Sequence, residues 1–121
     1  TDPALTSGAD GFSDYVPSGT SPDYSWSLGA SSARFGYTVG GTDTATRFLD
    51  NSTSCNQSGG SATANTCWDG FSTNNVAIAS NSNENYPLGA TTTVTVKAGI
   101  VANVQPLGSY SATIIGTAMA L

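Results

Sequence analysis

Alternation of apolar and polar residues is clearest in the C-terminal third of the chain. In the stretch 91–98, valine or alanine occupies positions 94, 96 and 98, and threonine or lysine occupies positions 93, 95 and 97. This two-residue period predicts a strand with Val94, Val96 and Ala98 facing inward and Lys97 facing solvent. The β-branched residues suit the pleated surface of a sheet.

The same alternation predicts further strands along the chain. Over 33–39 it places Phe35, Tyr37 and Val39 on one face, and a turn at 40–43 leads to a second strand at 44–49. Shorter apolar runs predict strands at 76–79, 100–104 and 109–121. About seven short strands separated by turn signals predict an all-β chain folded as an antiparallel β-sandwich over 33–121.

The first 32 residues show neither a strand period nor a helix period. Three prolines argue against a helix, whereas the large aromatic residues argue against disorder. We expect 1–32 to form an extended N-terminal arm or long loops, with one edge strand near 24–28. The arm either docks on a neighbouring molecule or folds back on its own domain, through the aromatic residues Phe12, Tyr15, Tyr24 and Trp26.

Charge and composition narrow the classes of function. The 121 residues carry 3 Lys and Arg against 8 Asp and Glu, a net charge of −5, and no histidine. So few cations cannot neutralise a track of phosphates, which excludes nucleic acid as a partner. No apolar run approaches the ~20 residues of a membrane-spanning helix, so we expect no membrane insertion. The weakly charged composition suits an extracellular or cell-surface protein.

Cys55 and Cys67 are the only cysteines, and eleven residues separate them. That spacing does not match a redox motif, and two cysteines without histidine are too few for a zinc site. We predict a local disulfide closing a polar loop, which would place the protein outside the cytoplasm. The alternative is a pair of buried, reduced thiols.

Two motifs near the C-terminus resemble a known class of domain. TTTVTVKAG at 91–99, followed by QPLGSYSATI at 105–114, is similar to the last two strands of secreted bacterial immunoglobulin-like sandwich domains. FGYTVGGTDT at 35–44, with SCN at 54–56 and CWDG at 67–70, resembles bacterial surface-protein domains. The resemblance implies an immunoglobulin-like fold at the cell surface. Pilin-like filament subunits share the closing motif, which implies filament formation.

Catalytic chemistry finds little support. There is no histidine to activate a serine and no nucleophile-elbow motif, so we expect no enzyme activity and no cofactor. Lys97 is the only lysine, and an isopeptide cross-link to asparagine would need it to face inward. The weak calcium candidates are the loop carboxylates Asp10, Asp14 and Asp50.

Aromatic residues outside the arm offer a second interpretation. Trp68, Phe71 and Tyr86, together with Trp26, supply flat rings on which sugars stack; the other interpretation is packing within the core. Asn51 and Asn56 each begin a sequence that matches the N-glycosylation pattern.

These observations predict a non-enzymatic extracellular structural subunit. Its expected partners are copies of itself in a filament, pilus, surface layer or adhesin, joined through the arm and through sheet edges that lack protective lysines. The alternative function is a carbohydrate-binding module that retains polysaccharide through surface aromatic residues. A third class, an enzyme that uses only Asp and Glu, has the least support.

Overall fold

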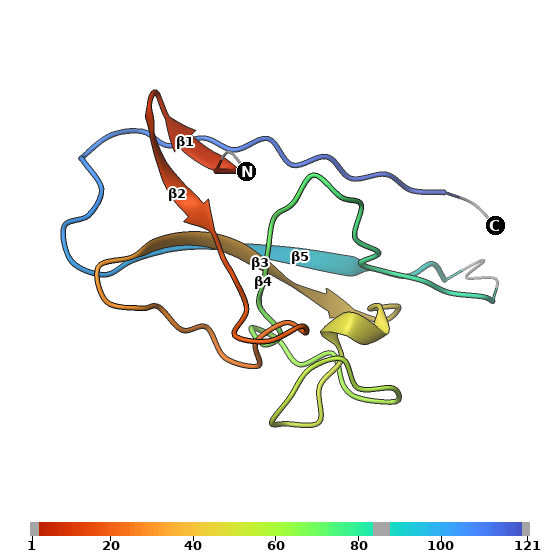
Figure 1. The fold of residues 1–121 in the computed structure, drawn as a ribbon. Helices are drawn as coiled ribbons and strands as arrows, with labels where there is room; N and C mark the ends of the chain where they lie inside the picture. The colour runs from red at the N-terminus through yellow and green to blue at the C-terminus, as the bar shows by residue number, and fades with distance from the viewer. Residues whose placement is uncertain (1–2, 84–87, 120–121) are drawn as a thin grey trace.

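A computed structural model describes residues 3–83 and 88–119, which form an all-β chain (Figure 1). Its strands are β1 (Leu5–Ser7), β2 (Asp10–Asp14), β3 (Ala33–Gly41), β4 (Asp69–Gly70) and β5 (Thr92–Ile100). One turn of 3-10 helix, η1, covers Thr46–Phe48. No helix in these two ranges has the length and apolar character needed to cross a membrane.

β3 is the centre of a mixed sheet of five strands. On one side it pairs antiparallel with β5 over its whole length, from Ala33 opposite Ile100 to Gly41 opposite Thr92. On its other side it pairs with β2 in parallel and then with β4 antiparallel. β1 forms a hairpin with β2, so the sheet runs from β1 at one end to β5 at the other.

The strands predicted over 33–39 and 91–98 are confirmed, but several others are not. The predicted strand at 44–49 is wrong, because the chain forms η1 there. The 76–79 run makes only the bridge between Thr44 and Ala79, and the 109–119 run makes only the bridge between Thr6 and Ser111. No strand forms at 24–28. A strand exists only where a second strand pairs with it, and the described residues show one mixed sheet in place of the expected seven-strand antiparallel sandwich.

Both faces of β3 are covered, which explains why it is the most buried strand. Phe35, Tyr37 and Val39 share one face, as predicted, and the Phe71 ring stacks on Phe35 at 4.9 Å between ring centroids. Phe48 and the two cysteines complete this core cluster. Burial, with a further contribution from the Asp69 carboxylate, raises the pKa of Tyr37 to about 12.

The predicted disulfide is present. Cys55 and Cys67 are bonded, with their Cα atoms 5.6 Å apart, and both side chains are buried. Just before this loop in the sequence, Asp50 is only 2% exposed, and its carboxylate accepts hydrogen bonds from Ser52 N at 2.8 Å and, within the loop, from Thr63 N at 3.3 Å. The cross-link and this carboxylate together shape a loop that has almost no apolar residues of its own.

The expected arm is part of the fold. β2 lies against β3, and the Tyr15 amide donates to the Phe35 carbonyl at 2.7 Å. Asp23 and Trp68 exchange two backbone hydrogen bonds of 3.0 and 2.8 Å. Residues 3–32 therefore pack along the sheet of their own chain, where Tyr15 is buried and Phe12, Tyr24 and Trp26 are half-buried.

Candidate functional site

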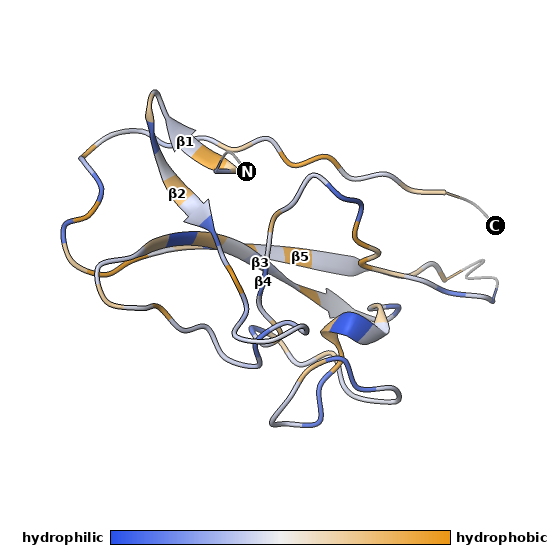
Figure 2. Cartoon of the chain, viewed as in Figure 1, coloured by the Kyte–Doolittle hydropathy of each residue, from blue (hydrophilic) through white to orange (hydrophobic). Residues whose placement is uncertain are grey.

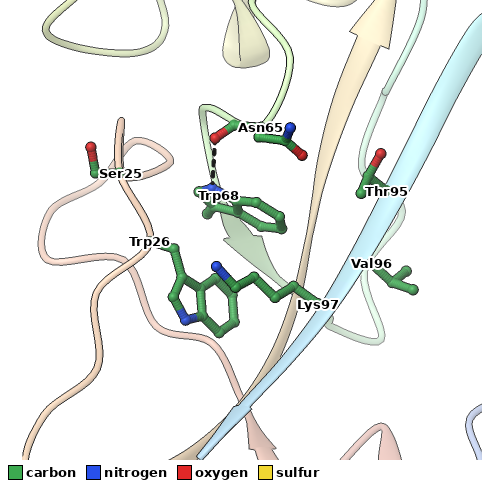
Figure 3. Close-up of a pocket in the computed structure, with 7 residues that line it drawn as sticks. All are labelled: Ser25, Trp26, Asn65, Trp68, Thr95, Val96 and Lys97. Atoms are coloured by element: carbon green, nitrogen blue, oxygen red, sulfur yellow. Dashed lines mark hydrogen bonds between the residues drawn. The ribbon is translucent and has the colours of Figure 1, made fainter.

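An open hollow of about 400 Å³ lies beside β5, where three segments of the chain meet (Figure 3). The loop at 25–26, the turn at 65–68 and β5 supply its lining: Ser25, Trp26, Asn65, Trp68, Thr95, Val96 and Lys97. The sequence suggested two separate sets of candidate residues, those of the arm and the aromatic residues after Cys67. The two sets meet in this hollow.

Two indole rings and one ammonium group form the hollow. Trp26 stacks on Tyr15 with ring centroids 4.4 Å apart and meets Trp68 edge-on at 5.1 Å. Lys97 Nζ lies 5.2 Å from the Trp26 ring and 5.3 Å from the Trp68 ring. Both distances fall within the range of cation–π attraction. Lys97 is exposed, as predicted, but its ammonium group lies over aromatic rings.

Two glycines in the sheet allow the rings to lie close to the backbone. Gly36 is opposite Lys97 in the register, and a Cβ atom there would lie 2.7 Å from Tyr15 Cβ. At Gly99 a Cβ atom would lie 3.0 Å from Trp26 Nε1. A side chain at either position would force Tyr15 or Trp26 away from the sheet, so these glycines are required for the hollow.

A hydrogen-bond network fixes the loop that carries Trp26. The Tyr15 hydroxyl donates to Asp23 Oδ2 at 2.6 Å, and Ser18 donates to the same carboxylate through its amide and its hydroxyl. Burial alone would raise the pKa of Asp23, but the hydrogen bonds from Tyr15 and Ser18 outweigh it and hold that pKa below its usual value. Burial and the bond to Asp23 raise the pKa of the Tyr15 hydroxyl.

Among the described residues, no carboxylate forms an ion pair with the ammonium group in the hollow. Within the described ranges the one ion pair joins Arg47 to Asp69, at 2.6 Å, and lies elsewhere. The Lys97 ammonium group is therefore available to an anionic group from outside the chain. The Asn65 amide and the Ser25 and Thr95 hydroxyls supply polar groups around it.

The four aromatic residues proposed for docking contact their own chain. The Phe12 ring meets Tyr110 edge-on at 5.1 Å, Tyr15 is 4% exposed, and Tyr24 packs on the core cluster. Trp26 alone of these four lines the hollow. In this conformation the arm does not present a set of free aromatic side chains to a neighbour.

The proposed sugar platform is also largely buried. Trp68 is 3% exposed, and its indole N–H donates to the Asn65 carbonyl at 3.0 Å. Phe71 is packed between the rings of Phe35 and Tyr37. Tyr86 lies outside the described residues. A sugar could reach the ring of Trp26 but not an open face of Trp68.

The remaining candidates lie apart from the hollow. The Asp50 carboxylate accepts a hydrogen bond from the Ser52 amide, and the Asp14 carboxylate accepts one from the Ala4 amide at 3.1 Å. Asp10 is exposed on β2. Within residues 3–83 and 88–119, no three His, Cys, Asp or Glu side chains are grouped to hold a metal. Asn51 and Asn56 are both exposed.

Sequence reasoning missed the exposure of β5. Its second edge, which we call the open edge, pairs with no strand in the described structure. Val94, Val96 and Ile100 are 39%, 47% and 47% exposed, although the alternation predicted an inward face. Figure 2 shows hydrophobic positions on this outer strand. The sequence feature that bears on this exposed strand is its shortage of charge, because residues 88–121 contain a single charged residue, Lys97.

Comparison with known proteins gives no relative. The chain matches no protein-family model, and neither the curated proteins nor the solved structures include a significant match. A function for this chain has to be argued from its own geometry.

Proposed function

We propose that this protein is a non-enzymatic structural subunit that assembles with other copies of itself through the open edge of β5. The observation that carries the proposal is a nine-residue strand with one edge unpaired within the described residues. Exposed edges of this length normally carry charges, prolines or bulges that prevent pairing. Lys97, the only charge on β5, lies over the rings of the hollow.

Apolar surface beside the open edge supports the proposal. Val94, Val96 and Ile100 share the face of the sheet on which Phe35, Tyr37 and Val39 build the core. The core covers that face over β3 but leaves it uncovered over β5. A second copy pairing with β5 would remove these side chains from water, at a gain of about 25 cal/mol per Å² of apolar surface.

The disulfide and the low charge support a location outside the cell. A cross-linked pair persists in an oxidising compartment. A surface of hydroxyl and amide groups with a net charge of −5 suits an exposed layer or filament. We therefore place the subunit in an extracellular or cell-surface structure, such as a filament, a pilus, a surface layer or an adhesin.

Val96→Lys tests the open edge. Val96 is 47% exposed, so a lysine there should leave the fold intact while placing a charge on the edge. The matched control is Val76→Lys, because Val76 is similarly exposed at 37% but lies in the loop after β4. Size-exclusion chromatography with light scattering and electron microscopy should show assemblies for the wild type and the control, and monomers for Val96→Lys. A wild-type protein that stays monomeric would refute the proposal.

The hollow favours a second candidate function, binding of an acidic polysaccharide. An ammonium group that forms no ion pair with a carboxylate of residues 3–83 or 88–119, set among hydroxyls and an amide, suits a sugar acid. Lys97→Met keeps the aliphatic stem and removes the charge, and it should abolish retention on a polyuronate column. Thr93→Met, on β5 outside the hollow, is the control. Equal retention of the wild type and Lys97→Met would exclude this function.

A further inference from the structure

The segment 112–119 has the form of a strand but lacks a strand's partner. It follows Ser111, which exchanges backbone hydrogen bonds of 3.0 and 2.9 Å with Thr6. Beyond that pair, no backbone hydrogen bond joins this segment to the rest of the described chain. Figure 1 shows the blue C-terminal run continuing past β1 in an extended conformation with no strand drawn beside it.

The sequence of this segment suits a sheet better than a solvated linker. Ile114, Ile115 and Met119 are 50%, 86% and 85% exposed. The segment ATIIGTAM contains β-branched residues, no charge and no proline. A linker remains in water because it is polar, whereas this segment would lose exposed apolar surface on pairing. Figure 2 shows its middle part as hydrophobic.

The open edge of β5 matches this segment. β5 has nine residues and the segment has eight, so their backbones are of nearly equal length. Both consist of small, β-branched and apolar residues, and no charge in the segment opposes Lys97. Each offers the other the backbone partners that it lacks, which is the basis of strand addition.

The segment starts at the wrong place to reach the open edge of its own chain. Ser111 pairs with β1, which stands at the opposite end of the strand order from β5. The preceding connection is anchored near β1 and β2, since Gln105 Nε2 donates to the Gly11 carbonyl at 2.7 Å and Tyr110 packs on Phe12. Pairing within one chain would close the sheet into a barrel or break these contacts.

We propose that residues 112–119 of one copy pair with the open edge of β5 in the next copy. This inference rests on the proposed function and names the element that joins the subunits. The donor and the acceptor lie at opposite ends of the strand order, so each copy gives one strand and receives one. Such a head-to-tail contact repeats from copy to copy, and it produces a filament unless its rotation closes the copies into a ring.

A complementation experiment with two full-length variants tests the proposal. Ile114→Pro/Ile115→Pro impairs the donor, because adjacent residues of a strand direct their N–H groups to opposite sides and one proline must face the partner. Val96→Lys impairs the acceptor. Each variant alone should be monomeric, and an equal mixture should yield a species with the mass of two chains and nothing larger. Ile114→Val/Ile115→Val, which keeps both N–H groups, should assemble as the wild type does.

Hydrogen exchange gives an independent measurement. In the mixed dimer the amides on the open edge of β5 in the proline variant should become protected, as should the amides of 112–119 that face β5 in the Val96→Lys variant. Circular dichroism should show both variants folded, since all three changed residues are exposed.

The outcomes separate this inference from the proposed function. If the proline variant still assembles while Val96→Lys does not, β5 is the interface but another segment is the donor, and this inference is wrong. If both are monomeric and their mixture forms no dimer, the segment does not pair with β5. If the wild type is monomeric with the amides on the open edge of β5 already protected, the segment pairs within its own chain, and both proposals fail.

Discussion

Asp50 is a buried carboxylate whose oxygen atoms are taken up by donors of the disulfide loop. Its oxygens accept from the Ser52 and Thr63 amides and, at 3.4 Å, from the Thr66 hydroxyl. Burial would raise the pKa of Asp50, but the hydrogen bonds from these three residues outweigh it and hold that pKa below its usual value. The charged carboxylate therefore stabilises the folded chain.

Acid should weaken the fold through this residue. A lowered carboxyl pKa contributes stability above the unfolded value of about 3.9, and the contribution is lost as pH falls through the lower folded pKa. Asp50→Asn should cost about 1–3 kcal/mol at neutral pH, because an amide cannot replace an acceptor of several bonds. Between about pH 4 and pH 2 it should then lose less stability than the wild type does.

Thermal denaturation followed by circular dichroism across this pH range measures the difference. Asp10→Asn is the control, since Asp10 is exposed on β2. If Asp50→Asn loses stability in acid as steeply as the wild type, Asp50 is not the group responsible.

At the scale of elements, the disulfide stabilises the 50–66 loop, which has almost no apolar residues to form a hydrophobic interior. It links Cys55 to Cys67, the residue before Trp68, which lines the hollow. Closing a loop of this separation, 12 residues, contributes about 3 kcal/mol in the chain-entropy model. The hollow therefore depends on the cross-link through Trp68.

Reduction should loosen this element first. The Cys55→Ala/Cys67→Ala variant should unfold at a lower denaturant concentration, with a loss of about 3 kcal/mol. The fluorescence change on reduction of the wild type should match that of the variant, because Trp68 follows Cys67 directly. A reduced protein that unfolds at the wild-type midpoint would show that packing alone holds the loop.

The sequence predicted the elements whose signal is local. Two such signals are the alternation around Tyr37 and Val96 and the spacing of the two cysteines. Each can be interpreted from residues that are close together in the sequence. The runs at 44–49, 76–79 and 109–119 have strand-like composition, but pairing depends on a distant partner that no local pattern specifies. The hollow was missed for the same reason, since it joins Trp26 to Lys97 across the sheet.

At the scale of the whole molecule, the two ends of the sheet differ. One end is β1, where Thr6 pairs with Ser111, the residue before the segment 112–119. The other end is the open edge of β5. The proposed contact carries little charge, because Lys97 is the one charged side chain in residues 92–100 and 112–119. Assembly should therefore depend on backbone pairing and apolar burial, and not on ion pairs.

The salt dependence of assembly distinguishes an interface of backbone pairing and apolar burial from an interface of ion pairs. Copies with a net charge of −5 repel one another, and added salt screens that repulsion. Between about 50 and 500 mM NaCl the assembly of the wild type should stay constant or increase, as measured by light scattering at fixed protein concentration. A marked loss of assembly in high salt would indicate an interface built on ion pairs, with Lys97 as the first residue to examine.

The position of the two tryptophans gives the protein a built-in optical probe. Trp26 and Trp68 are the only tryptophans in the chain, and both lie about 5 Å from the ammonium group of a residue on β5. Any event that shifts β5 changes the surroundings of every indole at once. Intrinsic emission should therefore follow the lag and growth phases of the proposed polymerisation in real time, without an added dye.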